Sequence, residues 1–407
     1  MRILFISQLF DPENSIKGLE FARRLQALGH EVEIVTTFPS YPGGKVYAGY
    51  QQRLKQVEMV DGIRVVRLPT FISHGTSAAK RMLSYASFGA VASLYGLLSN
   101  RRPDVIYAYY PPVIVGLTAM LLGKFRRVPF VYDVQDLWPE ALVATGNVQA
   151  DSSIVRWINR LCGLVYRQAD RIVVLSEGYK QALIAKQVPT EKIERIFNWC
   201  DESRMDADYM PRPDELDAAC FNILYAGNLG TAQALENVVE AASLLAQQGN
   251  RRVRFVFLGA GVAEMGLKKQ ASDLGLQNVQ FLPRVTVDQV GAYLSAADAL
   301  LVHLANDPVF DITIPQKTQA YMLAGRPILM AVGGEAGDIV RNAGAGVVVQ
   351  PCQPEQLAQA AIVLSELAHE ELQAMATRGR QYYLEKMSMQ NGVDSVNALL
   401  NAVIEMR

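Results

Sequence analysis

Residues that bind metals or form disulfides are few in this 407-residue chain. It has four cysteines and four histidines, and none of them occur in a CxxC pair or at the spacing of metal ligands. We therefore interpret the cysteines as reduced packing residues and expect no metal site.

The common phosphate-binding signatures are also missing. No GxGxxG follows the first predicted strand, and no GxxxxGK[ST] occurs in the chain. The sequence therefore supports neither a dinucleotide-binding fingerprint nor a nucleoside-triphosphate loop, although its apolar segments indicate an α/β protein.

Long hydrophobic runs and an excess of one charge are absent too. The net charge of -1 gives no general attraction to nucleic acid. No run reaches the roughly 18 apolar residues of a membrane-spanning helix, and the N-terminus lacks the features of a signal peptide. These absences predict a cytoplasmic protein.

Two shorter apolar stretches, residues 83–98 and 112–123, are flanked by lysine and arginine. One interpretation is a membrane-surface face on the first half of the chain, because basic residues attract anionic head groups while apolar ones enter the interface. This would place the protein at the inner face of the cytoplasmic membrane. The alternative is a pair of buried core helices.

Short apolar segments of strand length recur along the chain, separated by loops and helical patterns. Residues 2–36 are predicted to form a strand, a loop, a helix and a second strand, which together have the size of a βαβ unit. Continuous apolar strands of this kind suit a parallel sheet that is covered on both faces. Strands are predicted at residues 2–7, 32–36, 63–68, 105–108, 130–133, 172–175, 223–226, 255–258, 279–282, 300–302, 328–331 and 347–349.

The length predicts two domains. A polar stretch with two prolines, residues 201–217, is interpreted as the linker. We place an N-terminal domain at residues 1–196 and a C-terminal domain at 197–385, each starting with its own strand, glycine loop and helix.

Glycine loops after the predicted strands are candidate ligand sites, because ligands of parallel sheets bind beyond the carboxyl ends of strands. Such loops lie at residues 7–18, 227–233, 259–261 and 333–334. Helix N-termini there suit phosphate groups. Simple turn chemistry is the alternative for each loop.

The most informative segment is residues 307–327, DPVFDITIPQKTQAYMLAGRP. Lys317 near a helix start inside a cleft would hold a phosphate charge, or it is a solvated surface lysine. The segment resembles the donor-binding signature of the family-4 retaining glycosyltransferases, which have the GT-B fold. Further similar stretches are SQLFDPE, ALGHEVEIVTTFPSYPGGKVYAGY, YDVQDLWPEALVATG, YAGNLGTAQALENVVEA, FLPRV and IPQKTQAYMLAGRPIL.

The resemblance implies an α/β fold with two Rossmann-like domains that face a central cleft. The first domain would bind the acceptor and the second the nucleotide sugar, and a C-terminal helix, residues 386–407, would cross back to the first domain. Within the family the chain is most similar to bacterial transferases that build O-antigen and capsule, including the L-N-acetylfucosaminyl transferases.

The resemblance also implies donor-binding positions. Arg284 would meet the base, and Lys317 would face the diphosphate and take part in catalysis. Gly18 would let the first loop approach the donor phosphates from the other domain. The full set is Gly18, Gly227, Asn228, Gln233, Gly259, Arg284, Asp311, Ile314, Pro315 and Lys317.

The chain departs from the family pattern at two places. Where many members have two glutamates separated by seven residues, it has Ile312 and Ala320, and Asp311 is the nearby carboxylate. Asn228 and Gln233 replace an arginine and a lysine that commonly hold the diphosphate. Arg284 and Lys317 would therefore supply more of the positive charge.

On the acceptor side, Asp136 and Glu140 are candidate catalytic carboxylates. Asp136 would accept a hydrogen bond or a proton from the acceptor hydroxyl, or it structures a loop or caps a helix. Glu140 alternatively interacts with a helix dipole. Tyr41 and Lys45 are candidate acceptor contacts, in a loop that could equally be a mobile flap.

The resemblance implies a metal-independent transferase that uses a nucleotide diphosphate sugar, expected to be a UDP sugar such as UDP-N-acetyl-L-fucosamine. The acceptor would be a polyprenyl-diphosphate-linked saccharide, and nucleic acid is not an expected partner. The alternatives are a nucleotide-sugar epimerase or hydrolase of the same fold, and a catalytically inactive sugar-binding subunit.

Overall fold

The chain divides into two compact units. A computed structural model describes residues 1–41, 43–72, 78–110, 113–144, 148–202 and 212–406. Unit 1 comprises Met1–Phe197 and Gln390–Arg407, and unit 2 comprises Asn198–Met389. The division predicted at residue 196 lies beside this boundary, and much of the predicted linker falls outside the described residues. How the two halves face each other stays a prediction.

The described part of unit 1 contains one eight-stranded sheet in the order β3-β4-β2-β1-β5-β6-β7-β8. Neighbouring strands are parallel except β3, which runs antiparallel to β4. The strands are β1 Arg2–Ser7, β2 Glu31–Thr37, β3 Gln56–Val60, β4 Ile63–Leu68, β5 Val105–Tyr110, β6 Phe130–Val134, β7 Arg171–Val174 and β8 Ile193–Arg195.

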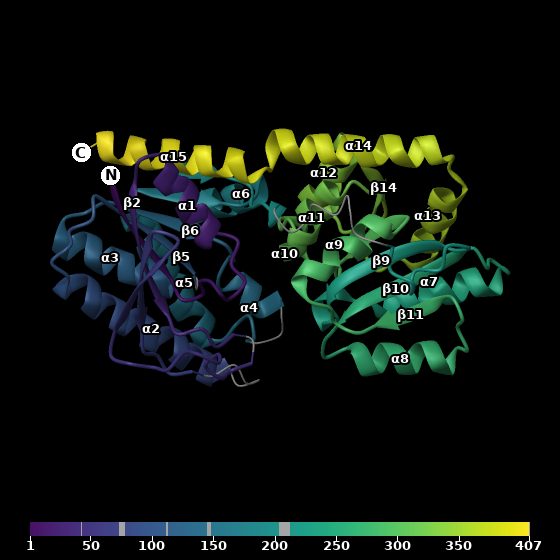
Figure 1. Cartoon of the computed structure of the whole chain (residues 1–407), viewed down its shortest axis with the longest axis horizontal. Coiled ribbons are helices and arrows are strands. Elements are labelled where there is room, and N and C mark those ends of the chain that lie inside the picture. Colours follow the sequence, from purple (N-terminus) through teal and green to yellow (C-terminus); the bar gives the residue numbers. More distant parts are fainter. Residues whose placement is uncertain (42, 73–77, 111–112, 145–147, 203–211, 407) are drawn as a thin grey trace. The chain divides into compact units, whose positions relative to one another are not determined.

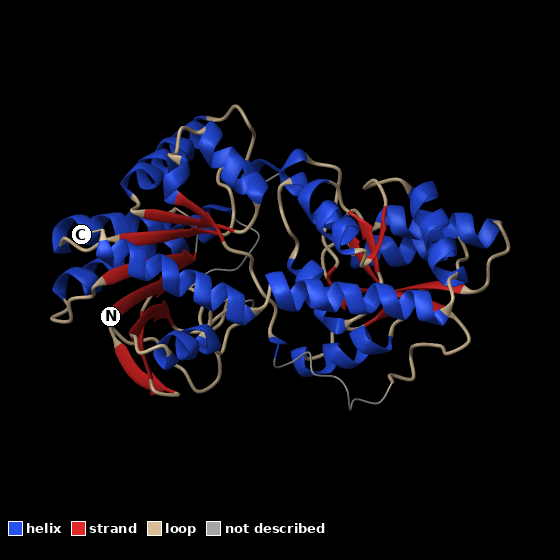
Figure 2. Ribbon diagram, turned by 90° about the horizontal axis from the view of Figure 1, so that it is seen from above, coloured by secondary structure: helices blue, strands red, loops and turns tan. Residues whose placement is uncertain are grey.

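Helices cover both faces of this sheet (Figure 2), which explains why the central strands are apolar along their whole length. In β1, for example, Ile3, Phe5 and Ile6 are all buried. The helices of unit 1 are α1 Leu19–Ala27, α2 Ala78–Leu98, α3 Ile114–Arg126, α4 Glu140–Ala144, α5 Ser153–Gln168, α6 Glu177–Ala185 and most of α15 Met389–Glu405.

The last helix, α15, lies beside α1 and the N-terminus in unit 1 (Figure 1). Its Asn397 contacts His30, with 2.6 Å between Oδ1 and Nε2, and Gln390 accepts a hydrogen bond from Arg24 at 3.0 Å. The prediction that the C-terminal helix packs back on the first domain is confirmed.

Unit 2 contains a parallel six-stranded sheet in the order β11-β10-β9-β12-β13-β14. Its strands are β9 Phe221–Asn228, β10 Val253–Ala260, β11 Val279–Leu282, β12 Ala299–His303, β13 Ile328–Ala331 and β14 Gly346–Val348. Its helices are α7 Glu236–Gln247, α8 Glu264–Asp273, α9 Val287–Ala296, α10 Pro308–Asp311, α11 Gln316–Ala324, α12 Gly334–Ala343, α13 Pro354–Glu366 and α14 His369–Lys386. The strand order matches the doubly wound arrangement of Rossmann-like domains.

Every predicted strand overlaps an observed one, but β3 and β8 were not predicted. Both lie at an edge of the sheet of unit 1. β3, with the sequence QVEMV, exposes two of its apolar side chains, and β8 has only three residues. Neither segment therefore has the continuous apolar pattern of a buried parallel strand.

Candidate active site

The sheet of unit 2 reverses its order between β9 and β12, which is the point where ligands of doubly wound sheets bind. Two glycines leave the backbone bare beside this point. Gly227 is the last residue but one of β9, with φ +139°, and Gly259 is the last but one of β10, with φ +150°. A Cβ at Gly259 would overlap the carbonyl oxygen of Gly227. The sequence therefore needs glycine here, and the two strand ends approach closely.

Lys317 reaches the same strand end from the first turn of α11. A Cβ at Gly227 would lie 2.9 Å from the Lys317 Nζ, and this Nζ lies 4.7 Å from the centroid of the Tyr225 ring. Burial lowers the pKa of Lys317 to about 8. Among the described residues the ammonium has no carboxylate partner. A desolvated cation beside bare backbone suits an anionic ligand.

Asn228 is the last residue of β9, and Gln233 lies in the loop that follows. The main-chain oxygen of Asn228 accepts a hydrogen bond from the Tyr225 hydroxyl at 2.8 Å. The side-chain oxygen of Gln233 accepts one from the Gly230 N–H at 3.1 Å. The Gln233 carbonyl contacts His303, whose pKa burial lowers to about 4 so that the ring is neutral. These contacts shape the loop, and the predicted donor contacts of both residues stay predictions.

The remaining donor candidates have different surroundings. Asp311 ends α10, and its Oδ1 lies 2.5 Å from where a Cβ of Gly333 would stand. Ile314 is buried, and Pro315 is the N-cap of α11. Arg284 is exposed in the loop after β11. The structure therefore brings Lys317 to the two strand-end glycines.

In unit 1, Gly18 provides space for a carboxylate of the chain itself. It is the N-cap of α1, and a Cβ there would overlap Oδ2 of Asp11. The same oxygen accepts a hydrogen bond from the Leu19 N–H at 2.7 Å. Asp11 therefore supplies an anion at this helix N-terminus, and the predicted approach of the first loop to the donor phosphates stays a prediction.

A buried charge cluster that the sequence did not reveal lies at the carboxyl ends of β5 and β6. Lys17 forms an ion pair with Asp133, and both side chains are fully buried. Asp133 also accepts hydrogen bonds from the Tyr107 hydroxyl and from the Gln135 amide, both at 2.5 Å. Lys17 further lies 5.4 Å from the centre of the Tyr109 ring. The cluster ties the first loop to the segment that carries Asp136.

Asp136 follows β6 and has an exposed side chain. It lies close enough to Tyr109 and Tyr110 to disfavour their ionised forms. Desolvation by the surrounding protein raises the pKa of Asp136. Because α4 begins only at Glu140, Asp136 is no N-cap of that helix. An accessible carboxyl group of raised pKa among tyrosines fits the predicted proton-accepting role.

Glu140 is engaged elsewhere. Its carboxylate pairs with Lys186 at 2.6 Å and lies near Cys162 and Tyr166. These contacts give Glu140 a structural role in unit 1, and its predicted catalytic role stays a prediction. It is the first residue of α4, as the helix-dipole alternative requires.

Tyr41 and Lys45 are both exposed. Their loop is held by Glu13, a buried residue that sequence reasoning missed. Its Oε1 accepts hydrogen bonds from the backbone N–H groups of Ser40 at 2.6 Å and Tyr41 at 2.7 Å. Burial raises the pKa of Glu13 despite these bonds, which act in the opposite direction.

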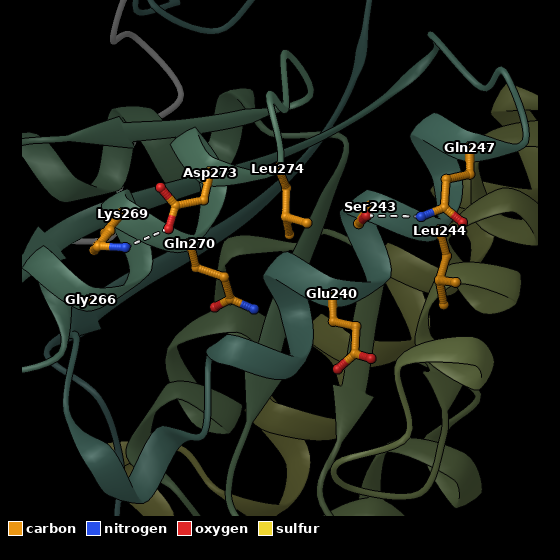
Figure 3. Close-up of a pocket in the computed structure, with 9 residues that line it drawn as sticks. All are labelled: Glu240, Ser243, Leu244, Gln247, Gly266, Lys269, Gln270, Asp273 and Leu274. Atoms are coloured by element: carbon orange, nitrogen blue, oxygen red, sulfur yellow. Dashed lines mark hydrogen bonds and ion pairs between the residues drawn. The ribbon is translucent and has the colours of Figure 1, made fainter.

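A surface groove of about 720 Å³ lies away from these residues (Figure 3). It runs between α7 and α8 and contains the 2.6 Å ion pair of Lys269 and Asp273. None of the predicted donor or acceptor residues lines it.

Two family models match the chain and together cover most of it. Residues 19–199 match the glycosyl transferase 4-like domain, and residues 217–382 match glycosyl transferases group 1. The chain is a family 4 glycosyltransferase. The resemblance inferred from the donor segment is thereby confirmed at the level of the family and of the enzyme class.

Two bacterial proteins that are named as glycosyltransferases are similar to the chain over most of its length. Its sequence is 29% identical over 374 residues to WcaI of Escherichia coli (strain K12), named as a colanic acid biosynthesis glycosyl transferase, covering 88% of this chain and 90% of that protein. It is 28% identical over 313 residues to WbjE of Pseudomonas aeruginosa, named as a glycosyltransferase, covering 74% and 76%.

Solved structures place the transferase in the GT-B fold. The crystal structure of Anabaena HepE in complex with UDP has a TM-score of 0.72 at 16% identity, covering 99% of this chain and 100% of that one. Sucrose-phosphate synthase from Thermosynechococcus elongatus has a TM-score of 0.74 at 15% identity, with both chains fully covered. The predicted fold class, with two Rossmann-like sheets, is confirmed.

Proposed function

We propose that the transferase moves a sugar from a UDP sugar to a polyprenyl-diphosphate-linked saccharide, with retention of the anomeric configuration, in bacterial surface polysaccharide synthesis. UDP-N-acetyl-L-fucosamine is the proposed donor. The observation that carries the donor half of this proposal is the desolvated ammonium of Lys317, which has no described carboxylate partner and lies at the bare end of β9.

A nucleotide diphosphate would supply the anion that this lysine lacks. Pairing it with Lys317 places positive charge where negative charge develops as the leaving diphosphate departs, which is the electrostatic role that a metal ion plays in other transferases. Among the described residues no group of three or more histidine, cysteine, aspartate or glutamate side chains could hold a metal ion. The proposed reaction is metal-independent, and the UDP bound by Anabaena HepE supports the choice of nucleotide.

The acceptor half of the proposal rests on Asp136. We propose that its carboxylate accepts a hydrogen bond or proton from the attacking hydroxyl, while Tyr41 and Lys45 contact the saccharide. The raised pKa of Asp136 brings it nearer to the range in which a carboxylate exchanges protons at neutral pH.

We also propose that unit 1 touches an anionic membrane at the cytoplasmic face, where a lipid-linked acceptor would be found. No described helix is long and apolar enough to span a bilayer. The outer face of α2 supports surface contact, because Leu83, Leu94 and Leu98 are 53%, 58% and 72% exposed. Residues 82–100 carry no charge, and lysine or arginine flanks them on both sides.

The second apolar stretch contributes mainly to the core. In α3, Val115, Ala119 and Leu122 are buried, as the core-helix alternative expects. Phe125, near its end, is 65% exposed between Lys124 and Arg126.

The test is a screen of UDP sugars with a polyprenyl-diphosphate-GlcNAc acceptor, carried out with EDTA present. We expect transfer with one UDP sugar, and its loss in Lys317→Ala with the melting temperature retained. Rapid conversion of the sugar without acceptor would favour the epimerase or hydrolase. Absence of turnover with every donor would favour the inactive subunit.

Membrane contact is tested separately by sedimentation with vesicles that contain anionic phospholipid. Binding should weaken at high salt and in Leu94→Glu. Leu274→Glu in unit 2, where the leucine is 48% exposed against 58% for Leu94, should bind as the parent does. Failure of the parent protein to bind at low salt would contradict this part of the proposal.

A further inference from the structure

The position of Lys317 depends on an aromatic ring beneath it. Tyr225 lies in β9, is 1% exposed, and presents its ring to the lysine ammonium at 4.7 Å. In the part of the chain that the structure describes, no carboxylate pairs with Lys317, and desolvation by burial lowers its pKa. The negative face of the ring is thus the attractive contact that the structure gives this cation.

The ring itself is firmly fixed. Its hydroxyl donates to the Asn228 carbonyl at 2.8 Å, and its other neighbour is the Phe257 ring of β10 at a centroid distance of 6.2 Å. Tyr225 belongs to the buried core of unit 2. Because the Tyr225 side chain is already fixed by these contacts, it loses little conformational entropy when it positions another group.

The titratable groups on neighbouring elements do not replace the ring. Tyr321 of α11 hydrogen-bonds the backbone of Ala226, and burial raises its pKa, so that it is neutral at physiological pH. His303 of β12 contacts the Gln233 carbonyl and is also neutral. Asp311 of α10 places its Oδ1 beside Gly333.

We propose that Tyr225 is a positioning residue, whose ring holds the Lys317 ammonium over Gly227 in readiness for the donor diphosphate. The identity of the ligand in this inference rests on the proposed function, whereas the interaction between the Tyr225 ring and Lys317 does not. The ring stabilises the charged form of Lys317, and only the charged form attracts phosphate. Tyr225 therefore controls how far into the alkaline range the donor site remains effective.

The first experiment needs no nucleotide. The reaction of Lys317 with an amine-modifying reagent is followed by mass spectrometry from pH 6 to 10, and the midpoint of its pH dependence is compared between variants. Tyr225→Phe keeps the ring and loses only the hydroxyl, so its midpoint should stay near that of the parent. Tyr225→Leu removes the ring, and its midpoint should fall by about half to one pH unit.

A matched control keeps the proposal falsifiable. Phe257→Leu removes an aromatic ring from the same core without touching the cation–π contact, and its midpoint should match that of the parent. If Tyr225→Leu does not fold, as judged by its melting transition, Tyr225→Met provides the same test with a longer side chain. A midpoint that is unchanged or higher without the ring would overturn the proposal, as would equal shifts in Tyr225→Phe and Tyr225→Leu.

The second experiment measures UDP binding by calorimetry between pH 6.5 and 9. Tyr225→Leu should bind as the parent does at pH 6.5 and several-fold more weakly at pH 8. If the parent does not bind UDP while the midpoint in Tyr225→Leu still falls, the proposed donor is wrong and the role of the ring stands. If the parent binds UDP and the two pH profiles coincide, the role of the ring is wrong.

Discussion

Replacing Lys317 by methionine should stabilise the protein while it weakens donor binding. The substitution keeps an unbranched apolar stem and removes the ammonium, which is desolvated and lacks a described carboxylate partner. A buried charge of this kind opposes folding unless a ligand compensates it. A residue that lowers the stability of the ligand-free protein is typical of a binding site.

The size of the effect follows from the pKa of Lys317, which falls from the ordinary 10.5 to about 8 on folding. At about 1.4 kcal/mol for each pKa unit, the ammonium costs at most roughly 3 kcal/mol. We therefore expect Lys317→Met to raise the free energy of unfolding at pH 7 by about 1–3 kcal/mol, since water and the Tyr225 ring offset part of the cost. For a unit of this size that corresponds to a melting temperature higher by several degrees.

The pH dependence has a definite sign. Below pH 8 the lysine is charged in both the folded and the unfolded chain, so the full cost is present. Between pH 8 and 10.5 the folded chain loses the proton and the unfolded chain keeps it, so the parent protein regains stability. The stability advantage of Lys317→Met should thus be largest at neutral pH and disappear by about pH 10.5.

Thermal melts at pH 7 and pH 10, each with and without UDP, measure these effects. UDP should raise the melting temperature of the parent at pH 7 more than that of the variant, because it supplies the missing anion. A lower melting temperature of Lys317→Met at pH 7, or an advantage that does not change with pH, would refute the reasoning.

Three further predictions concern other parts of the site. Lys17→Met leaves Asp133 buried without its cation and should lower the free energy of unfolding by about 3–5 kcal/mol, measured with denaturant. A smaller loss in the double variant Lys17→Met with Asp133→Asn would identify the unpaired carboxylate as the cause. An equal or greater loss in the double variant would contradict that explanation. Gly227→Ala places a methyl group 2.9 Å from the Lys317 Nζ at a backbone φ of +139°. UDP affinity, measured by calorimetry, should therefore fall at least tenfold. Unchanged affinity would show that this strand end lies outside the donor site. Glu13→Ala removes the acceptor of two loop N–H groups and should raise the acceptor KM several-fold while the donor KM stays constant; equal changes in both would indicate a general loss of structure.

The sequence predicted most of the secondary structure because buried parallel strands are apolar along their length. It also singled out Lys317 and Gly227 as candidates, because the spacing of the donor segment and the strand-glycine-helix pattern are local features. The two unpredicted strands are edge strands, whose residues need no such pattern.

The sequence by itself determined the α/β class, the order of the central strands along the chain and the enzyme family, since these depend on local periodicity and on contiguous motifs. Only the tertiary structure decided which charges are paired. Lys17 meets Asp133 across 116 positions of sequence, and Asp11 lies in the space that Gly18 leaves. It also placed Lys317 on Tyr225. A side chain's ionisation and availability depend on the neighbours that folding brings to it, and that is why the sequence identified the lysine but not the ring that holds it.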